Sequence, residues 1–294
     1  MHTRVRRLAA PLALLTALCL AAAGCSTQRA AEPGDVDAPA ARSARPAHPV
    51  PSAHPMRLPA ADAPFDYQLG GAYQPPAGVR AVSRDRSARP APGLYNVCYV
   101  NAFQAQPGDA VDWWRAHHPG LLLRDRRGAL VIDEDWHEPL LDISTAGKRG
   151  ELMDVVGGWL DGCAKAGFDA VEPDNLDSYQ RSDGLLDEAD AVAFAKLLVR
   201  RGHHDGLAVA QKNTGELLGR HKQIGFDFAV VEECAHYGEC PDFAAAYDRR
   251  IFDIEYDGKD FSAACRRFGR TLSVTLRDRD VLPAGAPGHR DERC

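Results

Sequence analysis

The sequence lacks the short motifs that mark several common classes of enzyme. Its 294 residues contain no Gly-x-Gly-x-x-Gly turn, no Gly-x-x-x-x-Gly-Lys-[Ser/Thr] loop and no Gly-x-Ser-x-Gly elbow. These absences argue against a dinucleotide-binding fold, a P-loop and an α/β-hydrolase nucleophile. The acidic segment 172–177 does not fit a calcium loop either, because Leu176 stands at a ligand position and no Gly follows. We therefore expect neither a cofactor nor a bound metal.

A surplus of positive charge and a membrane-length apolar run are also missing. The whole chain has a formal charge of −6, and residues 61–294 hold 28 basic and 38 acidic residues, a formal charge of −10. This balance argues against nucleic acid as a partner and suits a cationic substrate. The apolar run at 8–23 is too short and too close to the N-terminus for a membrane span.

The N-terminus instead resembles an export signal. A basic segment, 1–7, precedes the apolar run, and Ala21-Ala-Ala-Gly-Cys25 is similar to a bacterial lipobox. We predict a lipoprotein signal peptide at 1–24 and lipidation of Cys25, which would anchor the exported protein to the outer face of the cytoplasmic membrane. An ordinary secretory signal, with the protein released, is the alternative.

A tether is predicted between the signal and the folded part. Seven prolines lie between residues 26 and 60, and this stretch has almost no aliphatic periodicity. Such a Pro- and Ala-rich segment predicts an extended linker over 25–60, with a reach on the order of 100 Å at about 3.1 Å per residue. The folded domain is then expected at 61–294.

Six of the eight cysteines fall in the folded part, where export makes disulfides the default. One possible disulfide would close a short loop, a second would attach the C-terminal tail, and the two remaining cysteines would form a third. These candidates are Cys234 with Cys240, Cys265 with Cys294, and Cys98 with Cys163. The last two residues also suit buried thiols. A zinc site of Cys234, His236 and Cys240 matches no common signature and is the less favoured interpretation.

Short apolar runs alternate with longer amphipathic segments through the folded part, which is typical of a parallel sheet. Nine segments are candidate strands, one more than a barrel of eight strands needs, and we expect 140–143 to be the extra one. The nine candidates are 66–70, 79–83, 94–100, 140–143, 168–171, 207–210, 226–231, 250–256 and 271–275. Apolar periodicity predicts helices at 146–166 and 187–201. About 235 residues with this many units favour an α/β fold of the (β/α)₈ TIM-barrel type over a doubly wound sheet.

Polar residues gather where these strands are expected to end. Glu172, Asp174, Asn175 and Asp177 lie within six positions after the strand 168–171. Barrels display catalytic groups at the carboxyl ends of their strands, and acids, amides and tyrosines also follow other strands here. Amides fix sugar hydroxyls, aromatic rings stack on pyranose faces, and two carboxyls perform glycoside hydrolysis. Taken alone, 172–177 also suits a solvated loop of turn-forming residues.

Several ordered motifs make the chain similar to glycoside hydrolase family 114, the endo-α-1,4-polygalactosaminidases. The most specific pair is Pro173-Asp-Asn-x-Asp-x-Tyr179 with Glu232-Glu-Cys234 and Glu239-Cys240, within a resemblance that covers about 65–276. The other motifs are Phe65-Asp-Tyr-Gln-Leu-Gly70, Val97-Cys-Tyr-Val100, Leu141-Asp-Ile143, Gln211-Lys-Asn213 and Ile254-Glu-Tyr256. The resemblance implies a (β/α)₈ barrel that cleaves α-1,4-linked galactosamine polymers. It implies Asp174 and Glu232 as the catalytic pair.

Two departures from the family pattern bear on the site. Many members carry Tyr-Ile-Ser-Ala-Gly where this chain has Tyr99-Val-Asn-Ala-Phe103, a change that would reshape a loop facing the substrate. Where members carry Asn-Glu-Gln-Cys, this chain has Val231-Glu-Glu-Cys234, so two carboxylates are adjacent. Strand alternation lets only one of them point into the barrel mouth, and we choose Glu232, with Glu233 in reserve.

We predict an endo-acting hydrolase with Asp174 as nucleophile or base and Glu232 as acid, and we leave open whether it retains or inverts. The predicted substrate contacts are Gln68, Tyr99, Asp142, Asn175, Asp177, Tyr179, Lys212, Asn213 and Glu255. The expected partner is a cationic polysaccharide, membrane contact is limited to the lipid anchor, and the protein is expected to be a monomer. The alternatives are a non-catalytic carbohydrate-binding lipoprotein and a barrel hydrolase for another α-linked glycan.

Overall fold

The computed structural model describes residues 55–294, so the predicted signal peptide 1–24, Cys25 and the tether up to residue 54 lie outside the described residues. Residues at the end of the predicted tether already contact the domain. The Tyr95 hydroxyl donates to the Arg57 carbonyl at 2.9 Å, and the Arg57 guanidinium lies 3.3 Å from Asp169. No helix within the described part is both long enough and apolar enough to cross a bilayer.

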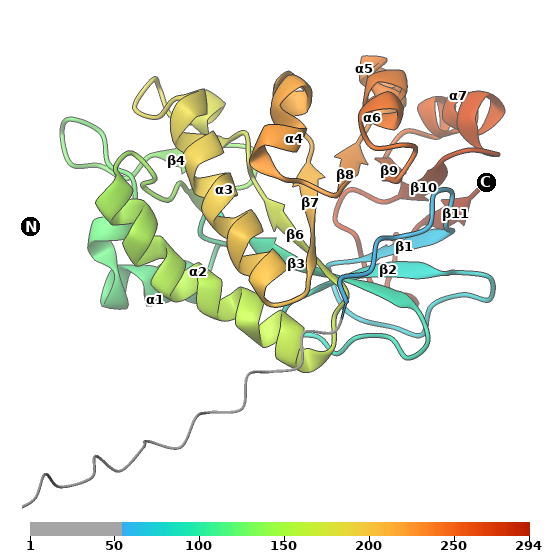
Figure 1. Ribbon diagram of the computed structural model, residues 1–294, viewed down its shortest axis with the longest axis horizontal. Coiled ribbons are helices and arrows are strands. Elements are labelled where there is room, and N and C mark those ends of the chain that lie inside the picture. The colour runs from blue at the N-terminus through green and yellow to red at the C-terminus, as the bar shows by residue number, and fades with distance from the viewer. Residues whose placement is uncertain (1–54) are drawn as a thin grey trace, which may run out of the picture. The chain divides into compact units, whose positions relative to one another are not determined.

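Eight parallel strands form a barrel-like sheet in which each strand pairs with the next along the chain (Figure 1). They are β1 (Phe65–Gln68), β2 (Ala81–Asp85), β3 (Tyr95–Asn101), β6 (Ala170–Asp174), β7 (Ala208–Lys212), β8 (Phe228–Glu232), β9 (Ile251–Glu255) and β10 (Ser273–Arg277). A ninth strand, β11 (Asp291–Arg293), pairs antiparallel with β10. The sheet closes where the Thr275 hydroxyl of β10 donates to the Phe65 carbonyl of β1 at 3.0 Å. The predicted (β/α)₈ barrel is confirmed.

Helices follow most of the strands and cover the outside of the barrel. They are α1 (Asp109–His117), α2 (Ala146–Ala166), α3 (Glu188–His204), α4 (His221–Ile224), α5 (Cys234–Tyr237), α6 (Cys240–Ala246) and α7 (Gly258–Phe268). Figure 1 shows α2 and α3 side by side over β3, β6 and β7. Loops alone, 69–80 and 86–94, follow β1 and β2 within the described chain. The outer residues of these two strands are nevertheless buried, so the barrel wall is covered there without a helix.

Local sequence explains the two long helices. Thr145 caps α2 by accepting a hydrogen bond from the Lys148 amide at 3.2 Å, and Gly167, with φ of 94°, ends it. Asp187 and Asp190 form a capping box at the start of α3. Both helices were predicted, although α3 continues to His204. The extra segment 140–143 forms isolated bridges beside the hairpin of β4 (Ile132–Asp133) and β5 (Glu138–Pro139), outside the barrel.

All three predicted cysteine pairs are disulfides. Cys98 of β3 joins Cys163 of α2, Cys234 joins Cys240 after β8, and Cys265 of α7 joins Cys294. The first bridge fastens the longest helix to the barrel wall. Three disulfides fit an exported protein, because reducing cytosols rarely permit them.

Alternation along the strands separates two cores. Side chains such as Phe65, Val97 and Ala170 point into the barrel, while their neighbours pack outward against the helices. Phe65 and Phe252 stack at 4.2 Å between ring centroids and fill the barrel interior. The parity of each strand therefore decides which polar residue at its carboxyl end faces the mouth.

Candidate active site

Three neighbouring strands bring a lysine and three carboxylates to the mouth of the barrel. On β6 the inward series Ala170, Glu172 and Asp174 runs from an apolar residue to two acids. By the same parity, β7 presents Lys212 and β8 presents Glu232. Since parallel strands end at one edge of the sheet, these side chains meet there.

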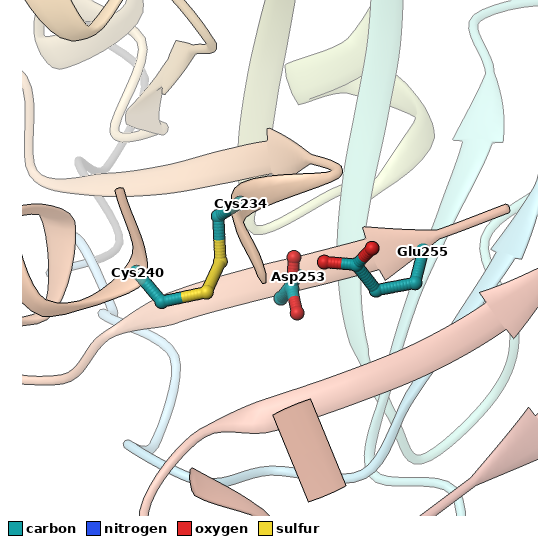
Figure 2. A group of neighbouring side chains, drawn as sticks. All are labelled: Cys234, Cys240, Asp253 and Glu255. Atoms are coloured by element: carbon teal, nitrogen blue, oxygen red, sulfur yellow. A yellow bond between two sulfur atoms is a disulfide. The ribbon is translucent and has the colours of Figure 1, made fainter. Parts of the chain in front are cut away.

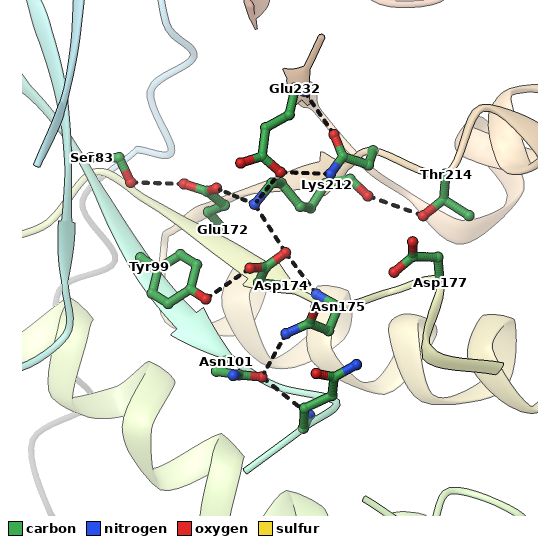
Figure 3. Close-up of polar contacts among 12 residues, drawn as sticks. Ser83, Tyr99, Asn101, Glu172, Asp174, Asn175, Asp177, Lys212, Thr214 and Glu232 are labelled. Atoms are coloured by element: carbon green, nitrogen blue, oxygen red, sulfur yellow. Dashed lines mark hydrogen bonds and ion pairs between the residues drawn. The ribbon is translucent and has the colours of Figure 1, made fainter. Parts of the chain in front are cut away.

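Lys212 lies at the centre of this group (Figure 3). Its Nζ is 3.0 Å from Asp174 Oδ1 and 3.4 Å from both Glu172 Oε1 and Glu232 Oε2. The side chain is only 3% exposed. Burial lowers the pKa of Lys212, but the three carboxylates raise it well above its ordinary value. A buried, permanent positive charge therefore holds the three acids together.

Asp174 is the best-supported anion of the group. Its Oδ2 accepts from the Tyr99 hydroxyl at 2.7 Å, and its Oδ1 accepts from the Asn175 amide at 2.7 Å and from Lys212. Burial by itself raises the pKa of this carboxyl. Lys212 and these hydrogen bonds outweigh burial, so the pKa lies below its ordinary value. Asp174 is thus ionised at neutral pH and suited to act as a nucleophile or base.

Glu232 is fixed from two sides and is more exposed than Asp174. Asn213 donates its Nδ2 to Glu232 Oε2 at 2.9 Å and accepts the Glu232 amide at 2.8 Å. The Tyr256 hydroxyl donates to Glu232 Oε1. The Glu232 side chain is 25% exposed, against 15% for Asp174, so it can reach a ligand in the mouth.

Glu172 lies one layer deeper and is fully buried. It accepts hydrogen bonds from the Tyr67 hydroxyl at 2.8 Å and the Ser83 hydroxyl at 2.7 Å. Burial raises the pKa of Glu172 to about 7, and Lys212 opposes this rise. Glu172 is therefore more easily protonated than Asp174, although both carboxyls contact Lys212.

The backbone turns sharply just after each of these strands. Asn175, Asn213 and Glu233 have φ values of 67°, 45° and 58°. Asparagine tolerates this left-handed region, but it is strained for glutamate, and such strain is concentrated at functional sites. Each turn follows directly on the residue that faces the mouth, so it fixes that residue at the very end of its strand.

The mouth opens into a cleft made of two hollows. The first, of about 370 Å³, contains Asp174, Lys212 and Glu232 in its walls. The second, of about 420 Å³, is adjacent. They share six lining residues: Trp136, Asp177, Asn213, Glu232, Tyr256 and Arg279. The cleft therefore continues past the carboxylate pair, with room for several sugar units.

Five predicted substrate contacts line the cleft: Tyr99, Asn175, Asp177, Lys212 and Asn213. Arg181 holds Asp177 through two hydrogen bonds of 2.8 Å. Glu233, the reserve acid, lines the second hollow but not the first, because strand parity turns it away from Asp174.

Four other predicted contacts lie outside the cleft, and these expectations are corrected. Gln68 points outward from β1, where it accepts from Arg84 Nε at 2.8 Å. Asp142 accepts from the Ser144 hydroxyl at 2.6 Å and pairs with Lys148 near the start of α2. Tyr179 packs against the outer core, and Glu255 points away from the mouth.

Glu255 belongs to a buried cluster behind β9, with Asp253 and the disulfide between Cys234 and Cys240 (Figure 2). Glu255 accepts the Ala235 amide at 2.8 Å and so holds the start of α5. Burial raises the pKa of Asp253 well above its ordinary value and that of Glu255 to about 7. The two sulfurs are bonded to each other, so they are not thiolate ligands in this state.

The sequence interpretation missed several residues of the cleft. Tyr67 and Tyr256 are the inward neighbours of Gln68 and Glu255, and correct strand parity would have identified them. Trp136 and Glu138 come from the β4–β5 hairpin, which inserts between β3 and α2 and carries no barrel periodicity. Burial raises the pKa of Glu138 to about 7.

Comparisons with known proteins agree with this geometry. The family model of glycoside-hydrolase family GH114 matches residues 46–294. The fold is similar to the crystal structure of Aspergillus fumigatus Ega3 in complex with galactosamine, with a TM-score of 0.66 and 23% identity over 82% of this chain and 98% of that one. It is also similar to the glycoside hydrolase domain of PelA from Pseudomonas aeruginosa, with a TM-score of 0.55 and 14% identity over 76% and 97% of the two chains. No curated protein matches the sequence.

Proposed function

The chain belongs to glycoside-hydrolase family GH114 and is a glycoside hydrolase, and from this premise we propose that it cuts α-1,4-linked galactosamine polysaccharides at internal bonds. The observation that carries the proposal is the pair Asp174 and Glu232, bridged by Lys212 inside a cleft that continues beyond them. The galactosamine bound to Ega3 supports the choice of sugar. The formal charge of −10 over residues 61–294 suits a cationic polymer.

The shared contact with Lys212 keeps the two carboxylates close enough for a retaining mechanism. Asp174 Oδ1 and Glu232 Oε2 contact the same Nζ atom at 3.0 and 3.4 Å. The two oxygens are thus at most about 6.4 Å apart, a limit that includes the roughly 5–5.5 Å between the carboxyls of retaining enzymes.

In the proposed mechanism, Asp174 attacks C1 of the sugar while Glu232 gives its proton to the departing glycosidic oxygen. The C1–oxygen bond breaks as the Asp174–C1 bond forms, which yields a glycosyl-enzyme. Water then attacks C1, Glu232 takes its proton, and the Asp174–C1 bond breaks. Lys212 keeps Asp174 anionic, while Tyr256 and Asn213 hold Glu232 in place.

Lining residues would bind the sugars on either side of the bond that is cut. Asn175, Asp177 and Asn213 offer amide and carboxylate groups to hydroxyls, and Tyr99 and Trp136 offer aromatic surface. No protein cation within the described chain other than Lys212 contacts Asp174 or Glu232. The substrate's own ammonium groups would therefore meet a mainly acidic surface.

The N-terminal sequence supports the proposed location. Removal of residues 1–24 and lipidation of Cys25 would anchor the enzyme to the outer face of the membrane, as a monomer on the tether 25–60. Such a tether, on the order of 100 Å when extended, would let the enzyme reach polymer away from the bilayer. Metabolic labelling with a fatty-acid analogue tests this, because Cys25→Ala should abolish labelling.

The function is tested by digestion of de-N-acetylated α-1,4-galactosaminan with the purified protein, its Asp174→Asn variant and its Glu232→Gln variant. Mass spectrometry should detect short oligomers with the wild type, and each variant should be slower by about 10²–10⁴-fold. Binding without cleavage by the wild type would indicate a carbohydrate-binding lipoprotein. Neither binding nor cleavage would indicate a different glycan.

A further inference from the structure

The β4–β5 hairpin places a carboxylate in the first hollow that no protein cation neutralises. Glu138 lies at the start of β5, and the exposed Trp136 precedes it on the same hairpin. Both residues line the hollow that contains Asp174 and Glu232. Across the described chain, no Lys, Arg or His nitrogen lies within the 4.0 Å limit of an ion pair with Glu138.

The other acids near Glu138 are already paired. Lys212 forms ion pairs with Asp174 and Glu232. Arg181 forms ion pairs with Asp177 at 2.8 Å and with Asp133 at 2.6 Å. Asp280 also lines the hollow without an ion pair, but it is exposed to solvent. Glu138 is only 8% exposed, so a charge on it has little water to stabilise it.

Neutral amides are the partners of Glu138. Its Oε2 accepts from Asn101 Nδ2 at 2.7 Å and from Asn175 Nδ2 at 3.4 Å. Asn101 Oδ1 in turn accepts from Asn175 Nδ2 at 3.0 Å, and the backbone N–H of Asn175 donates to Asp174 Oδ1 at 2.7 Å. This series of hydrogen bonds orients Glu138 and links it to the predicted nucleophile. In Figure 3, Asn101 and Asn175 lie on the side of Asp174 away from Glu232.

Burial raises the pKa of Glu138 to about 7, with the charges of Asp174 and Asp133 adding to the rise. Hydrogen bonds from Asn101 and the more distant charge of Arg181 oppose it. The site therefore holds a carboxyl whose ionised form is destabilised in the free protein. A cation placed beside it would recover that energy, and a neutral group would not.

We propose that Glu138 selects an unacetylated amino sugar in the cleft, by accepting a hydrogen bond from the ammonium group of a sugar bound next to Asp174. This inference rests on the proposed function and adds a specificity residue to it. A bulkier, neutral acetamide would leave the Glu138 charge unpaired and is disfavoured. Trp136, on the same hairpin, would present its ring to the sugar.

The test compares two polymers in the same enzyme preparation: de-N-acetylated α-1,4-galactosaminan and the same material after chemical N-acetylation. The wild type should prefer the first. Glu138→Gln should reduce this preference by about 10- to 100-fold, mainly through a higher KM for the deacetylated polymer, because a hydrogen bond to a charged group is lost. Glu138→Asp, which keeps the charge, should restore part of it.

Glu134→Gln is the matched control, since it removes an equal charge from an exposed position on the same hairpin, outside both hollows. It should leave the preference unchanged. The preference is the ratio of the kcat/KM values for the two polymers in one enzyme sample. Partial unfolding of a variant lowers both values equally and leaves the ratio unchanged. A Glu138→Gln preference equal to the wild-type value, or a wild type that cuts both polymers equally, overturns the inference while the hydrolase function stands. A wild type that cuts neither refutes the proposed function itself.

Discussion

Replacing Lys212 with Met removes the positive charge that Asp174, Glu172 and Glu232 share. Coulomb's law gives roughly 5 kcal/mol for unit charges separated by the 3.0 Å between Nζ and Asp174 Oδ1, at an effective dielectric constant of about 20. In proteins, an opposite charge this close lowers a carboxyl pKa by about 1–3 units. We therefore expect the pKa of Asp174, now below its ordinary value, to rise by about that amount in Lys212→Met.

The assay is the dependence of kcat/KM on pH, from about pH 3 to about pH 8, with deacetylated polymer as substrate. In the proposed mechanism Asp174 acts as a carboxylate, so the acid limb should follow its protonation in the free enzyme. The substrate's ammonium groups stay protonated across this limb, so their charge does not change there. The limb should move to higher pH by about 1–3 units in Lys212→Met. Lys222→Met, which removes an exposed charge from α4, should leave it in place.

Loss of stability has to be separated from this result, because acid unfolding would move the limb in the same direction. Breaking a buried ion pair costs about 3–5 kcal/mol, so part of the Lys212→Met protein is expected to unfold. The folded fraction is therefore measured by circular dichroism at each pH and divided out of kcat/KM, so that the midpoint of the acid limb refers to the folded enzyme. An acid limb that coincides with that of the wild type would refute the role given to Lys212.

Three further outcomes are expected. Tyr256→Phe removes a hydrogen bond to Glu232, the proposed general acid, and should lower kcat by about 10- to 100-fold with little change in KM; an equal effect on KM alone would contradict this. Burial raises the pKa of Glu255 to about 7, so its contribution to stability is present below the unfolded value near 4.5 and is lost as pH rises through 7. Glu255→Gln should therefore flatten the fall of Tm between about pH 5 and about pH 8. Replacing both Cys98 and Cys163 with Ala should cost about 4 kcal/mol, against about 2 for the short bridge after β8, because their sequence separation is 65 rather than 6; denaturant midpoints in the opposite order would refute the chain-entropy account.

Much of the barrel could be predicted from local sequence. Apolar runs located all eight strands to within a few residues, because a buried parallel strand is nearly continuous in hydrophobicity. The segment after β6 was recognisable as a site, since its acids and amides follow an apolar strand. Two cysteine pairs followed from export and from their positions in the chain, whereas Cys98 and Cys163 were paired only as the two that remained.

Strand parity accounts for two of the errors. Gln68 and Glu255 were each assigned to the mouth, but their inward neighbours are Tyr67 and Tyr256. A shift of one residue along a strand exchanges the inner and outer faces. In β1 and β9 both alternating positions are buried, so polarity alone did not reveal the correct face.

The hairpin that carries Trp136 and Glu138 could not be predicted in the same way. Its strands, β4 and β5, have two residues each, which is too short for a periodic signal. Their position depends on long-range contacts, such as the bond from Gln104 to Asp133 at 3.1 Å. Lys212 was expected to bind substrate, but its three carboxylate partners lie on β6 and β8 and were brought together by the fold.

The two joined hollows also bear on how a solution of the polymer should behave during digestion. A cleft that continues past the carboxylate pair would let a chain settle into it sideways, without first presenting an end. Cuts would then fall at random along each chain, and a few of them would halve the mean chain length. The viscosity of the solution should collapse while the yield of new reducing ends is still small, whereas an enzyme that trims from one end would release sugar long before the solution thins.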